Sequence, residues 1–188
     1  MSGEEAVRII TGKFKGRQLV TVPDGSVRPA TDRVKSTIFN VLQTRLDLRG
    51  IAVLDLFAGS GSLGFEALSR GARLVTFVDD QPTALASIQQ NAEKLGCFEQ
   101  CSLIRYEAMG FMKNNGNRFG LVFADPPYAF TETAAIPRLI REYKLLDNGG
   151  FLIIEHPKRL QFPGEDSSFI RLQKDFGHTR VTFFQQPE

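Results

Sequence analysis

From residue 51 onward, apolar runs of strand length alternate with longer segments that have helical spacing. The runs that predict buried strands cover 51–57, 74–78, 102–106, 121–124 and 151–155. The segments between them predict helices over 62–70, 82–95 and 132–144, the second opening on Pro82 and the third kinked or restarted at Pro137. Two last runs, 168–174 and 179–185, flank a turn at 176–178 and predict the closing strands. This alternation favours a mainly parallel sheet with helices on both faces.

The first fifty residues have a different pattern. Two short β-prone runs, 7–12 and 17–22, lie on either side of Lys13-Phe14-Lys15-Gly16 and predict a hairpin. A turn is expected at 23–26, followed by a helix that Thr31 or Asp32 caps. The apolar stripe of that helix is Val34, Ile38, Val41 and Leu42. We therefore divide the chain into an extra or disordered start over 1–7, an N-terminal hairpin and helix over 8–49, and an α/β domain over 50–188.

Composition indicates one ordinary globular α/β domain. The chain has 188 residues, of which 42% are hydrophobic and 23% are charged. No apolar run approaches the roughly 18 residues of a membrane span, and the acidic start has no signal-peptide character, so a cytoplasmic protein is expected. The only cysteines are Cys97 and Cys101, and the only histidines are His156 and His178. We expect reduced thiols, structural histidines and no metal site.

Charge is spread unevenly along the chain, although the net charge is only +2. Residues 8–49 hold nine Lys or Arg against three Asp, which makes this segment basic and the remainder acidic. Such a segment is typical of proteins that bind a polyanion, although a solvated basic face without a partner would have the same composition. The candidate RNA-binding residues are Lys13, Lys15, Arg17, Arg28, Arg33 and Lys35.

A glycine-rich motif follows the first strand of the α/β region. Gly59, Gly61 and Gly64 have Gly-x-Gly-x-x-Gly spacing between a strand and a helix, which allows a tight turn and close approach to a ligand. Asp79 ends the next strand, where a carboxylate accepts hydrogen bonds from ribose hydroxyls. The spacing also fits dinucleotide oxidoreductases. However, Asp55 precedes the glycines, where a carboxylate would repel a pyrophosphate and attract an ammonium group.

A second motif, Asp125-Pro126-Pro127-Tyr128, ends the strand over 121–124. The aspartate accepts an N–H, the prolines stiffen the loop and leave their carbonyl oxygens free, and the tyrosine offers a flat face to a base. These four residues are our candidate catalytic residues, suited to presenting a planar amino group to an electrophile. Together the two motifs point to S-adenosylmethionine, which carries an ammonium group, a sulfonium and a ribose but no phosphate.

On these motifs the chain resembles class I S-adenosylmethionine-dependent N-methyltransferases. More narrowly, it resembles the bacterial RsmD-type enzymes that methylate the guanine N2 of 16S ribosomal RNA. The resemblance extends over nearly the whole chain from Arg8 and includes segments 8–12, 15–17, 28–35, 38–40, 55–64 and 125–128, with Gly177 and Thr179 near the end. Three positions depart from the family pattern: Lys35 replaces an Arg, Asp79 a Glu, and Glu107 an Asp expected at the adenine amino group.

The resemblance implies a single Rossmann-like class I methyltransferase domain. Its sheet would have seven mainly parallel strands with an antiparallel last strand, preceded by the N-terminal hairpin and helix. S-adenosylmethionine would be the cofactor, no metal would be needed, and 16S ribosomal RNA, free or within a small-subunit particle, would be the partner. The implied cofactor-binding residues are Asp55, Phe57, Ala58, Gly59, Ser60, Gly61, Gly64, Asp79, Asp80, Glu107 and Ala108.

Three alternatives remain at this point. A DNA amino-methyltransferase would share the acceptor motif but usually carries a long target-recognition insertion, for which 188 residues leave no room. A protein-glutamine methyltransferase would have Asn in place of Asp125 and would not need the basic segment. An RNA-binding module without catalysis would not need both the donor and the acceptor motifs.

Overall fold

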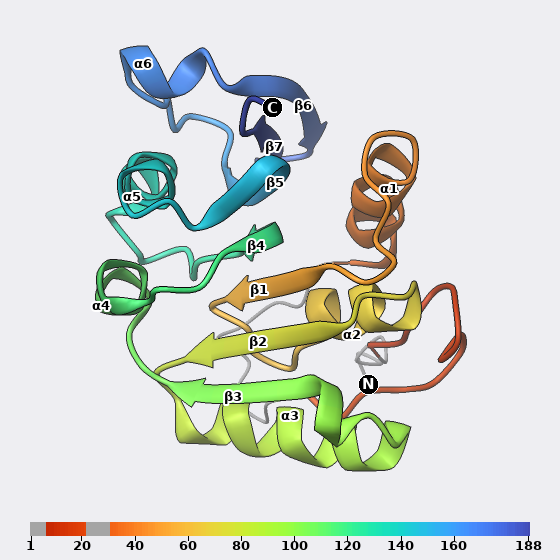
Figure 1. Ribbon diagram of the computed structural model, residues 1–188. Coiled ribbons are helices and arrows are strands. Elements are labelled where there is room, and N and C mark those ends of the chain that lie inside the picture. The colour runs from red at the N-terminus through yellow and green to blue at the C-terminus, as the bar shows by residue number, and fades with distance from the viewer. Residues whose placement is uncertain (1–6, 22–30) are drawn as a thin grey trace.

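The computed structural model describes residues 7–21 and 31–188, and a seven-stranded sheet forms its centre (Figure 1). The sheet order is β3-β2-β1-β4-β5-β7-β6, and only β7 runs antiparallel to its neighbours. This confirms the predicted mainly parallel sheet with an antiparallel last strand. The strands are β1 (Ala52–Leu56), β2 (Leu74–Asp79), β3 (Cys101–Arg105), β4 (Phe119–Ala124), β5 (Leu146–Pro157), β6 (Ile170–Phe176) and β7 (Thr179–Gln185).

Helices cover both faces of the sheet (Figure 1). They are α1 (Asp32–Leu42), α2 (Ser62–Ser69), α3 (Pro82–Leu95), α4 (Ala108–Asn114), α5 (Ile136–Glu142) and α6 (Gly164–Ser167), with short 3₁₀ turns at Phe98–Gln100 and Thr133–Ala135. Side chains of α1, α2 and α3 share one hydrophobic cluster with one face of the strands, and α4 and α5 share a second cluster with the other face. The central strands are therefore buried on both sides, which explains their unbroken apolar runs.

Local signals account for several of the helix ends. The Thr31 hydroxyl accepts from the Val34 N–H at 3.3 Å and caps α1 as predicted. Pro82 occupies the first turn of α3, and Gly96 ends that helix in the left-handed region. The helix predicted over 132–144 is instead a 3₁₀ turn followed by α5, with Pro137 in the first turn of α5. Proline lacks the N–H that an earlier helical turn would require, so the helix begins there.

Several elements differ from the sequence-based expectation. Helices α4 and α6 were not predicted, and both are short, at seven and four residues. Strand β5 begins at Leu146 rather than 151 because the chain enters the sheet beside Phe119, with an irregularity in register before Leu121. Short helices and strand extensions of this kind are specified by their neighbours in the fold more than by their own sequence.

The predicted N-terminal hairpin is present as a short antiparallel pairing rather than as two regular strands. Within residues 7–21 the structure has a compact loop closed by one antiparallel bridge, Arg8 with Gln18. The two runs pair there through their backbones, since the Ile9 N–H donates to the Arg17 carbonyl at 3.0 Å and the Leu19 N–H donates to the Val7 carbonyl at 2.8 Å. The loop also bonds to helix α2, because the Lys13 N–H donates to the Ser69 carbonyl at 2.8 Å. At Gly12, with φ +87°, a Cβ would lie 1.9 Å from the Ser69 carbonyl oxygen, so only glycine permits this approach. We call residues 7–21 the N-terminal arm. The turn predicted at 23–26 lies outside the described residues.

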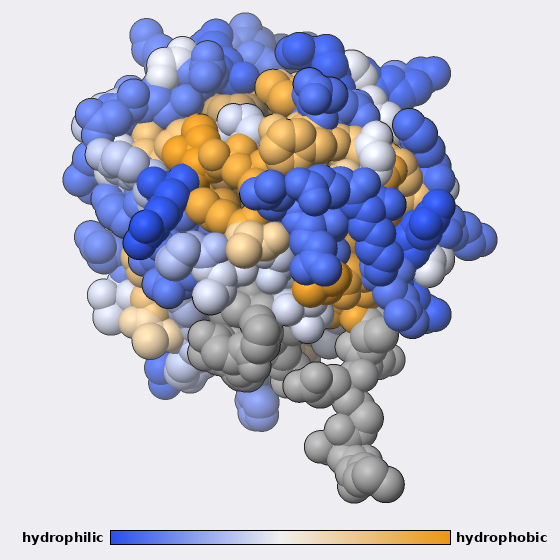
Figure 2. Space-filling view, turned by 90° about the horizontal axis from the view of Figure 1, so that it is seen from below, coloured by the Kyte–Doolittle hydropathy of each residue, from blue (hydrophilic) through white to orange (hydrophobic). Residues whose placement is uncertain are grey.

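The β3 edge of the sheet is only partly covered. Figure 2 looks onto this side and shows a band of hydrophobic surface bordered by hydrophilic residues. Residues 101–104 of β3 are half-buried there. Among the described residues, no helix is long and apolar enough to cross a membrane.

Candidate active site at the ends of β1 to β4

The strand order reverses between β1 and β4, and the candidate site lies at the carboxyl ends of these strands. In open α/β sheets this reversal leaves a crevice in which ligands bind. Each predicted motif follows a strand end here: the glycine-rich turn follows β1, Asp79 ends β2, Glu107 follows β3 and Asp125 follows β4. The motifs are separated by up to 70 residues in the sequence, but parallel pairing brings them to one edge.

The glycine-rich turn after β1 is held closely against helix α2 and strand β2. A Cβ at Gly64 would lie 2.3 Å from the Phe77 ring of β2, so glycine is required for α2 to pack this closely on the sheet. The Gly64 N–H donates to the Asp55 carboxylate at 3.0 Å. Asp55 is 2% exposed, and burial raises its pKa to about 8, with the charge of Asp79 adding to the rise. Asp55 is therefore mostly protonated at neutral pH until a cation approaches.

Asp79 fixes the turn from the β2 side. Its two carboxylate oxygens accept from the Gly59 N–H and the Gln81 N–H, each at 2.9 Å. Burial raises the pKa of Asp79, although the hydrogen bonds from Gly59 and Gln81 oppose this effect. Each carboxylate oxygen has a second lone pair, so both remain able to accept a further hydrogen bond.

A cavity of about 540 Å³ opens at this edge, within the size range of small-molecule sites. Its lining includes the predicted residues Phe57, Gly59, Asp79, Asp80, Glu107, Ala108, Asp125 and Pro127. The other predicted residues do not line it: Asp55, Ala58, Ser60, Gly61 and Gly64 are buried behind the wall, and Pro126 and Tyr128 lie outside the lining. The cavity thus brings together both predicted motifs, with the buried residues supporting those that line it.

The lining also includes residues that the sequence analysis missed. They are Val78, Gln81, Thr83, Ala84, Tyr106 and Phe130. Gln81 lies two residues after the end of β2 and Tyr106 directly after the end of β3, so the rule that placed Asp79 could have found them. Phe130 had no such signal, because it reaches the site through its edge-on contact with Phe57, with ring centroids 4.9 Å apart. Glu107 has an additional role, since its carboxylate caps α4 by accepting from the Met109 and Gly110 N–H groups.

Asp125 lies between the cavity and further acidic groups. Burial raises its pKa well above the ordinary value, and the charges of Glu155 and Asp55 raise it further. Asp125 is therefore a stronger base than an exposed aspartate. After the two prolines, the Phe130 N–H donates to the Pro127 carbonyl at 2.8 Å and closes a tight turn. Tyr128 lies in this turn with 73% of its surface exposed, so its ring is open to solvent next to the cavity.

The basic residues of the N-terminal segment do not all face solvent. Lys13, Lys15 and Arg17 are exposed on the N-terminal arm, and Arg33 is exposed on α1. Arg28 lies outside the described residues. Lys35 was predicted to bind RNA, but its side chain is fully buried, so it is not available for an RNA contact.

Lys35 holds the arm onto the body of the protein. Its ammonium group donates to the Arg8 carbonyl and lies 3.8 Å from an Asp32 carboxylate oxygen. Burial lowers the pKa of Lys35, and the charges of Glu66 and Asp32 act against that shift. Glu66, also buried, accepts from the Ile10 N–H at 2.8 Å. Lys35 therefore connects the N-terminal arm to helix α1. Its positive charge serves this internal contact, which the sequence alone did not show.

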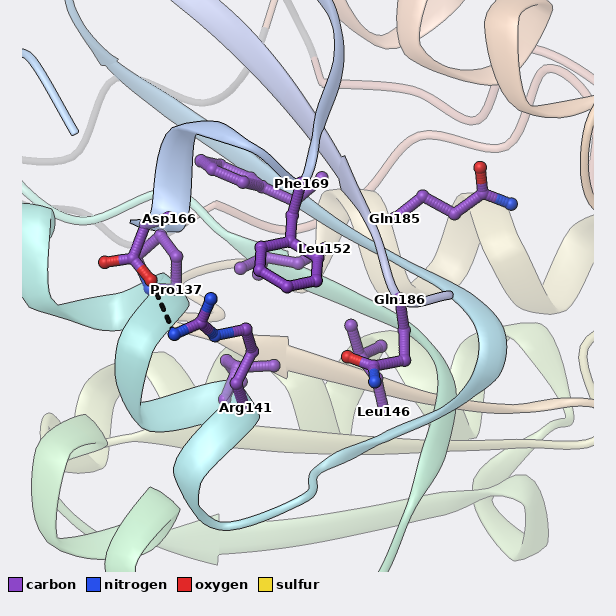
Figure 3. A pocket seen from close by; sticks show the side chains of 10 residues that line it. Pro137, Arg141, Leu146, Leu152, Asp166, Phe169, Gln185 and Gln186 are labelled. Carbon is purple, nitrogen blue, oxygen red and sulfur yellow. Dashed lines mark ion pairs between the residues drawn. The ribbon is translucent and has the colours of Figure 1, made fainter. Parts of the chain in front are cut away.

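A second hollow, between α5, α6 and the sheet, is too small to be a ligand site (Figure 3). Its volume is about 10 Å³, room for about one water molecule. Arg141 and Asp166 form an ion pair at its rim, with 3.3 Å between nitrogen and oxygen. In the described part of the chain, no group of three or more Asp, Glu, His or Cys residues has the arrangement of a metal site.

Comparison with known proteins identifies the family. A family model described as "Conserved hypothetical protein 95" matches residues 7–185 of this chain. The Ribosomal RNA small subunit methyltransferase D of Haemophilus influenzae is 39% identical to it over 155 residues, which span 81% of this chain and 79% of that protein. The chain belongs to the RsmD family of methyltransferases.

A further relative and two solved structures are also similar to this chain. The Ribosomal RNA small subunit methyltransferase D of Escherichia coli K12 is 36% identical over 127 residues, which span 68% of this chain and 63% of that protein. A solved Haemophilus influenzae structure, 32% identical, has a TM-score of 0.81 and covers 97% of this chain, with 99% of its own length matched. Thermus thermophilus 16S rRNA N2 G1207 methyltransferase, solved with AdoMet and guanosine, shares the fold at 21% identity, with a TM-score of 0.68 over 96% of this chain and 49% of that one.

Proposed function

We propose that this protein transfers a methyl group from S-adenosylmethionine to the exocyclic N2 of a guanine in 16S ribosomal RNA. The observation that carries the proposal is the position of Asp125. It borders the same cavity as Asp79 and the glycine-rich turn, so a donor held by the turn and an acceptor held by Asp125 would meet there. The names of the relatives support ribosomal RNA of the small subunit as the substrate.

The residues present fit the proposed cofactor. Asp79 lines the cavity with a half-buried carboxylate that can accept from ribose hydroxyls, and Asp55, buried behind the lining, would act on an ammonium group through its charge. At the end of the glycine-rich turn, the Ser62 hydroxyl is buried without a hydrogen-bond partner among the described residues, so its O–H is available to donate to a ligand. Phe57, Tyr106 and Phe130 add aromatic surface to the lining. When bound, the cofactor supplies a methyl group already activated by a sulfonium, so no metal is required.

Asp125 and the Pro126 carbonyl are the groups we propose to orient the acceptor. Each would accept one N–H of the guanine amino group and so turn the nitrogen lone pair toward the methyl carbon. The bound cofactor would supply the methyl carbon, whose bond to sulfur would be replaced by the bond to nitrogen, while Asp125 and the Pro126 carbonyl would keep that nitrogen in line with it. The nitrogen becomes positively charged and then loses a proton to Asp125 or to water. The raised pKa of Asp125 suits this step, because it makes the carboxylate a better acceptor for that proton.

Tyr128 and the basic residues would provide the RNA contacts. The target base must leave its own stack to enter the cavity, and the exposed ring of Tyr128 is placed to stack on it. Lys13, Lys15, Arg17 and Arg33 would bind backbone phosphates. Lys35 is excluded from this set by its burial.

Methyl transfer from labelled S-adenosylmethionine tests the proposal directly. Purified protein would be incubated with RNA, DNA and protein fractions from a strain that lacks the enzyme, and label in each fraction would be counted. Label is expected in 16S RNA, as free RNA or within small-subunit particles, and nucleoside mass spectrometry should find N2-methylguanosine. Asp125→Ala, which removes the acceptor oxygens, is the inactive control.

Two outcomes would contradict the proposal. Label in DNA or protein instead of RNA would assign a different acceptor class to the same cavity. Label in RNA on adenine would retain the enzyme class and exclude guanine N2 as the acceptor.

A further inference from the structure

The turn formed by Pro157, Lys158, Arg159 and Leu160 lies beside the acceptor loop, although 30 residues separate Arg159 from Tyr128 in the sequence. The Arg159 guanidinium lies 5.9 Å from the centroid of the Tyr128 ring, within the range of a cation–π contact. Arg159 is exposed, and none of the carboxylates in residues 7–21 and 31–188 lies within ion-pair distance of it. An unpaired cation therefore stands next to the most exposed aromatic ring among the described residues.

The two side chains are presented by backbone that is fixed. The Leu160 N–H donates to the Pro157 carbonyl at 2.9 Å, which closes a tight turn, and the Lys158 N–H donates to the His178 carbonyl at 2.9 Å. Tyr128 stands in the equivalent tight turn closed by Pro127 and Phe130. Both turns thus hold their backbone while leaving the side chains free to meet a ligand.

The buried side chain of His156 supports the turn formed by residues 157–160. It is 2% exposed, and its Nδ1 must carry the proton because its partner, the Pro157 carbonyl at 2.9 Å, can only accept. Its Nε2 then accepts from the Thr182 hydroxyl at 2.7 Å. Burial lowers the pKa of His156, which keeps it neutral in this role. The structural role expected for His156 is thus to hold the turn that carries Arg159.

Lys158, next to Arg159 on the same turn, differs from it because Lys158 forms an ion pair. Lys158 lies 2.9 Å from Asp175, which also binds Arg180 at 2.7 Å. These contacts hold the pKa of Asp175 well below its usual range. Of two neighbouring cations on one turn, Lys158 is held by Asp175, which also holds Arg180, whereas no carboxylate among the described residues holds Arg159. Arg159 is therefore the cation of this turn whose side chain is not held in place by an ion pair among the described residues.

We propose that Arg159 and Tyr128 form one subsite for the target nucleotide, in which Tyr128 stacks on the flipped base and Arg159 binds the adjoining RNA backbone phosphate. An arginine suits both contacts, because its planar guanidinium binds a phosphate with two parallel hydrogen bonds and also stacks on an aromatic ring. The subsite would hold the flipped base at the entrance to the cavity that Asp125 borders. This assignment rests on the proposed RNA methylation and adds a residue from a different part of the chain to the RNA contacts.

Steady-state kinetics with unmethylated 16S RNA tests the subsite in the full-length protein. Arg159→Ala should raise the KM for RNA about tenfold, the usual scale of a charge-assisted hydrogen bond, and lower kcat by a smaller factor. The slope of log affinity against log salt should fall by about 0.7 to 0.9, the value for one phosphate contact. Arg159→Lys should recover the salt slope but not the full kcat, because lysine keeps the charge and loses the planar contact with Tyr128.

Lys158→Ala is the matched control, since it removes the neighbouring charge while Asp175 keeps its pair with Arg180. It should change KM and the salt slope less than twofold. Binding of S-adenosylmethionine should be unchanged in every variant. A double-mutant cycle with Tyr128→Ala should show coupling, because the two side chains act on one nucleotide.

The results separate this proposal from the proposed function. If wild-type protein does not methylate RNA, the proposed function fails. If wild type methylates RNA but Arg159→Ala behaves like Lys158→Ala, or shows no coupling to Tyr128→Ala, the enzyme assignment holds and the subsite is wrong.

Discussion

Asp79 at the end of β2 and Tyr128 after β4 border the same end of the sheet, but their surroundings differ. Asp79 is half-buried, and both of its oxygens accept from backbone N–H groups. Tyr128 is 73% exposed, and its ring lies within cation–π range of Arg159. At the end of β2 a half-buried carboxylate is thus fixed by backbone N–H groups, whereas the loop after β4 presents an exposed ring next to a cation.

The difference follows from the sizes of the proposed ligands. A small cofactor can be enclosed, so its site gains from buried groups that the backbone fixes in place. An RNA strand must remain largely outside the protein, so only one base can enter while its neighbours meet surface side chains. Substitutions in the two regions should therefore differ in their effects. Some should lower the rate of methyl transfer or the affinity for the cofactor, and others should change only the affinity for RNA.

Asp125→Ala should have the largest effect. Asp125 faces the acceptor, and removing a contact made in the transition state costs about 10²-fold or more in rate. Single-turnover methyl transfer would measure this loss, and calorimetry should find S-adenosylmethionine binding nearly intact. A rate within threefold of wild type would remove Asp125 from the proposed mechanism. The wild-type rate should also rise with pH, because Asp125 must lose its proton before it can act as a base.

Asp79→Ala should weaken cofactor binding rather than slow the chemical step. A charge-assisted hydrogen bond of this kind contributes about 1.5–3 kcal/mol, or about 10- to 150-fold in affinity. Calorimetric titration with S-adenosylhomocysteine measures it without turnover, and Asp80→Ala on the exposed neighbouring position is the comparison. If Asp80→Ala causes the loss and Asp79→Ala does not, the ribose contact belongs to Asp80.

Asp55 should make cofactor binding depend on pH. Its pKa of about 8 in the free protein means that it carries a proton at pH 6.5, whereas the cofactor ammonium favours the ionised carboxylate. Binding should therefore release close to one proton, and affinity should rise with pH by up to about tenfold per unit below pH 8. Above that pH the rise should stop, because Asp55 is already ionised and the α-amino group of the ligand loses its own charge.

Calorimetry at pH 6.5 in two buffers of different ionisation enthalpy counts the released proton. Asp55→Asn keeps the shape but cannot ionise, so its release should be close to zero and its affinity nearly flat below pH 7. Equal proton release in wild type and Asp55→Asn would show that another group titrates.

The N-terminal arm should have the smallest effect on catalysis. Lys15 and Arg17 are exposed, and among the described residues no carboxylate pairs with them. Reversing both to Glu should remove about two units of the salt slope for RNA and leave the rate at saturating RNA unchanged. Lys113→Glu with Arg118→Glu, exposed at α4 and just before β4, is the control with the same change of charge. Equal effects of the two pairs would mean that the arm has no specific role.

Much of the candidate site could be predicted because its residues follow strand ends. The runs before Asp79 and Asp125 are apolar enough to identify as strands, and parallel pairing then requires their ends to meet. The same reasoning failed for helix α4, which is seven residues long and begins at the Glu107 cap. A helix this short depends on packing against the second hydrophobic cluster, so its own sequence gave little signal.

Local pattern by itself determined the strand and helix order, the mainly parallel sheet and the meeting of the two motifs at one edge. Those features depend on the periodicity of side chains and on backbone rules that act over a few residues. The burial of Lys35 and the contact of Arg159 with Tyr128 were decided only by the tertiary structure. A charge looks the same in the sequence whether it faces solvent or a buried carbonyl. Its environment is set by residues far along the chain, such as Arg8 for Lys35 and Tyr128 for Arg159.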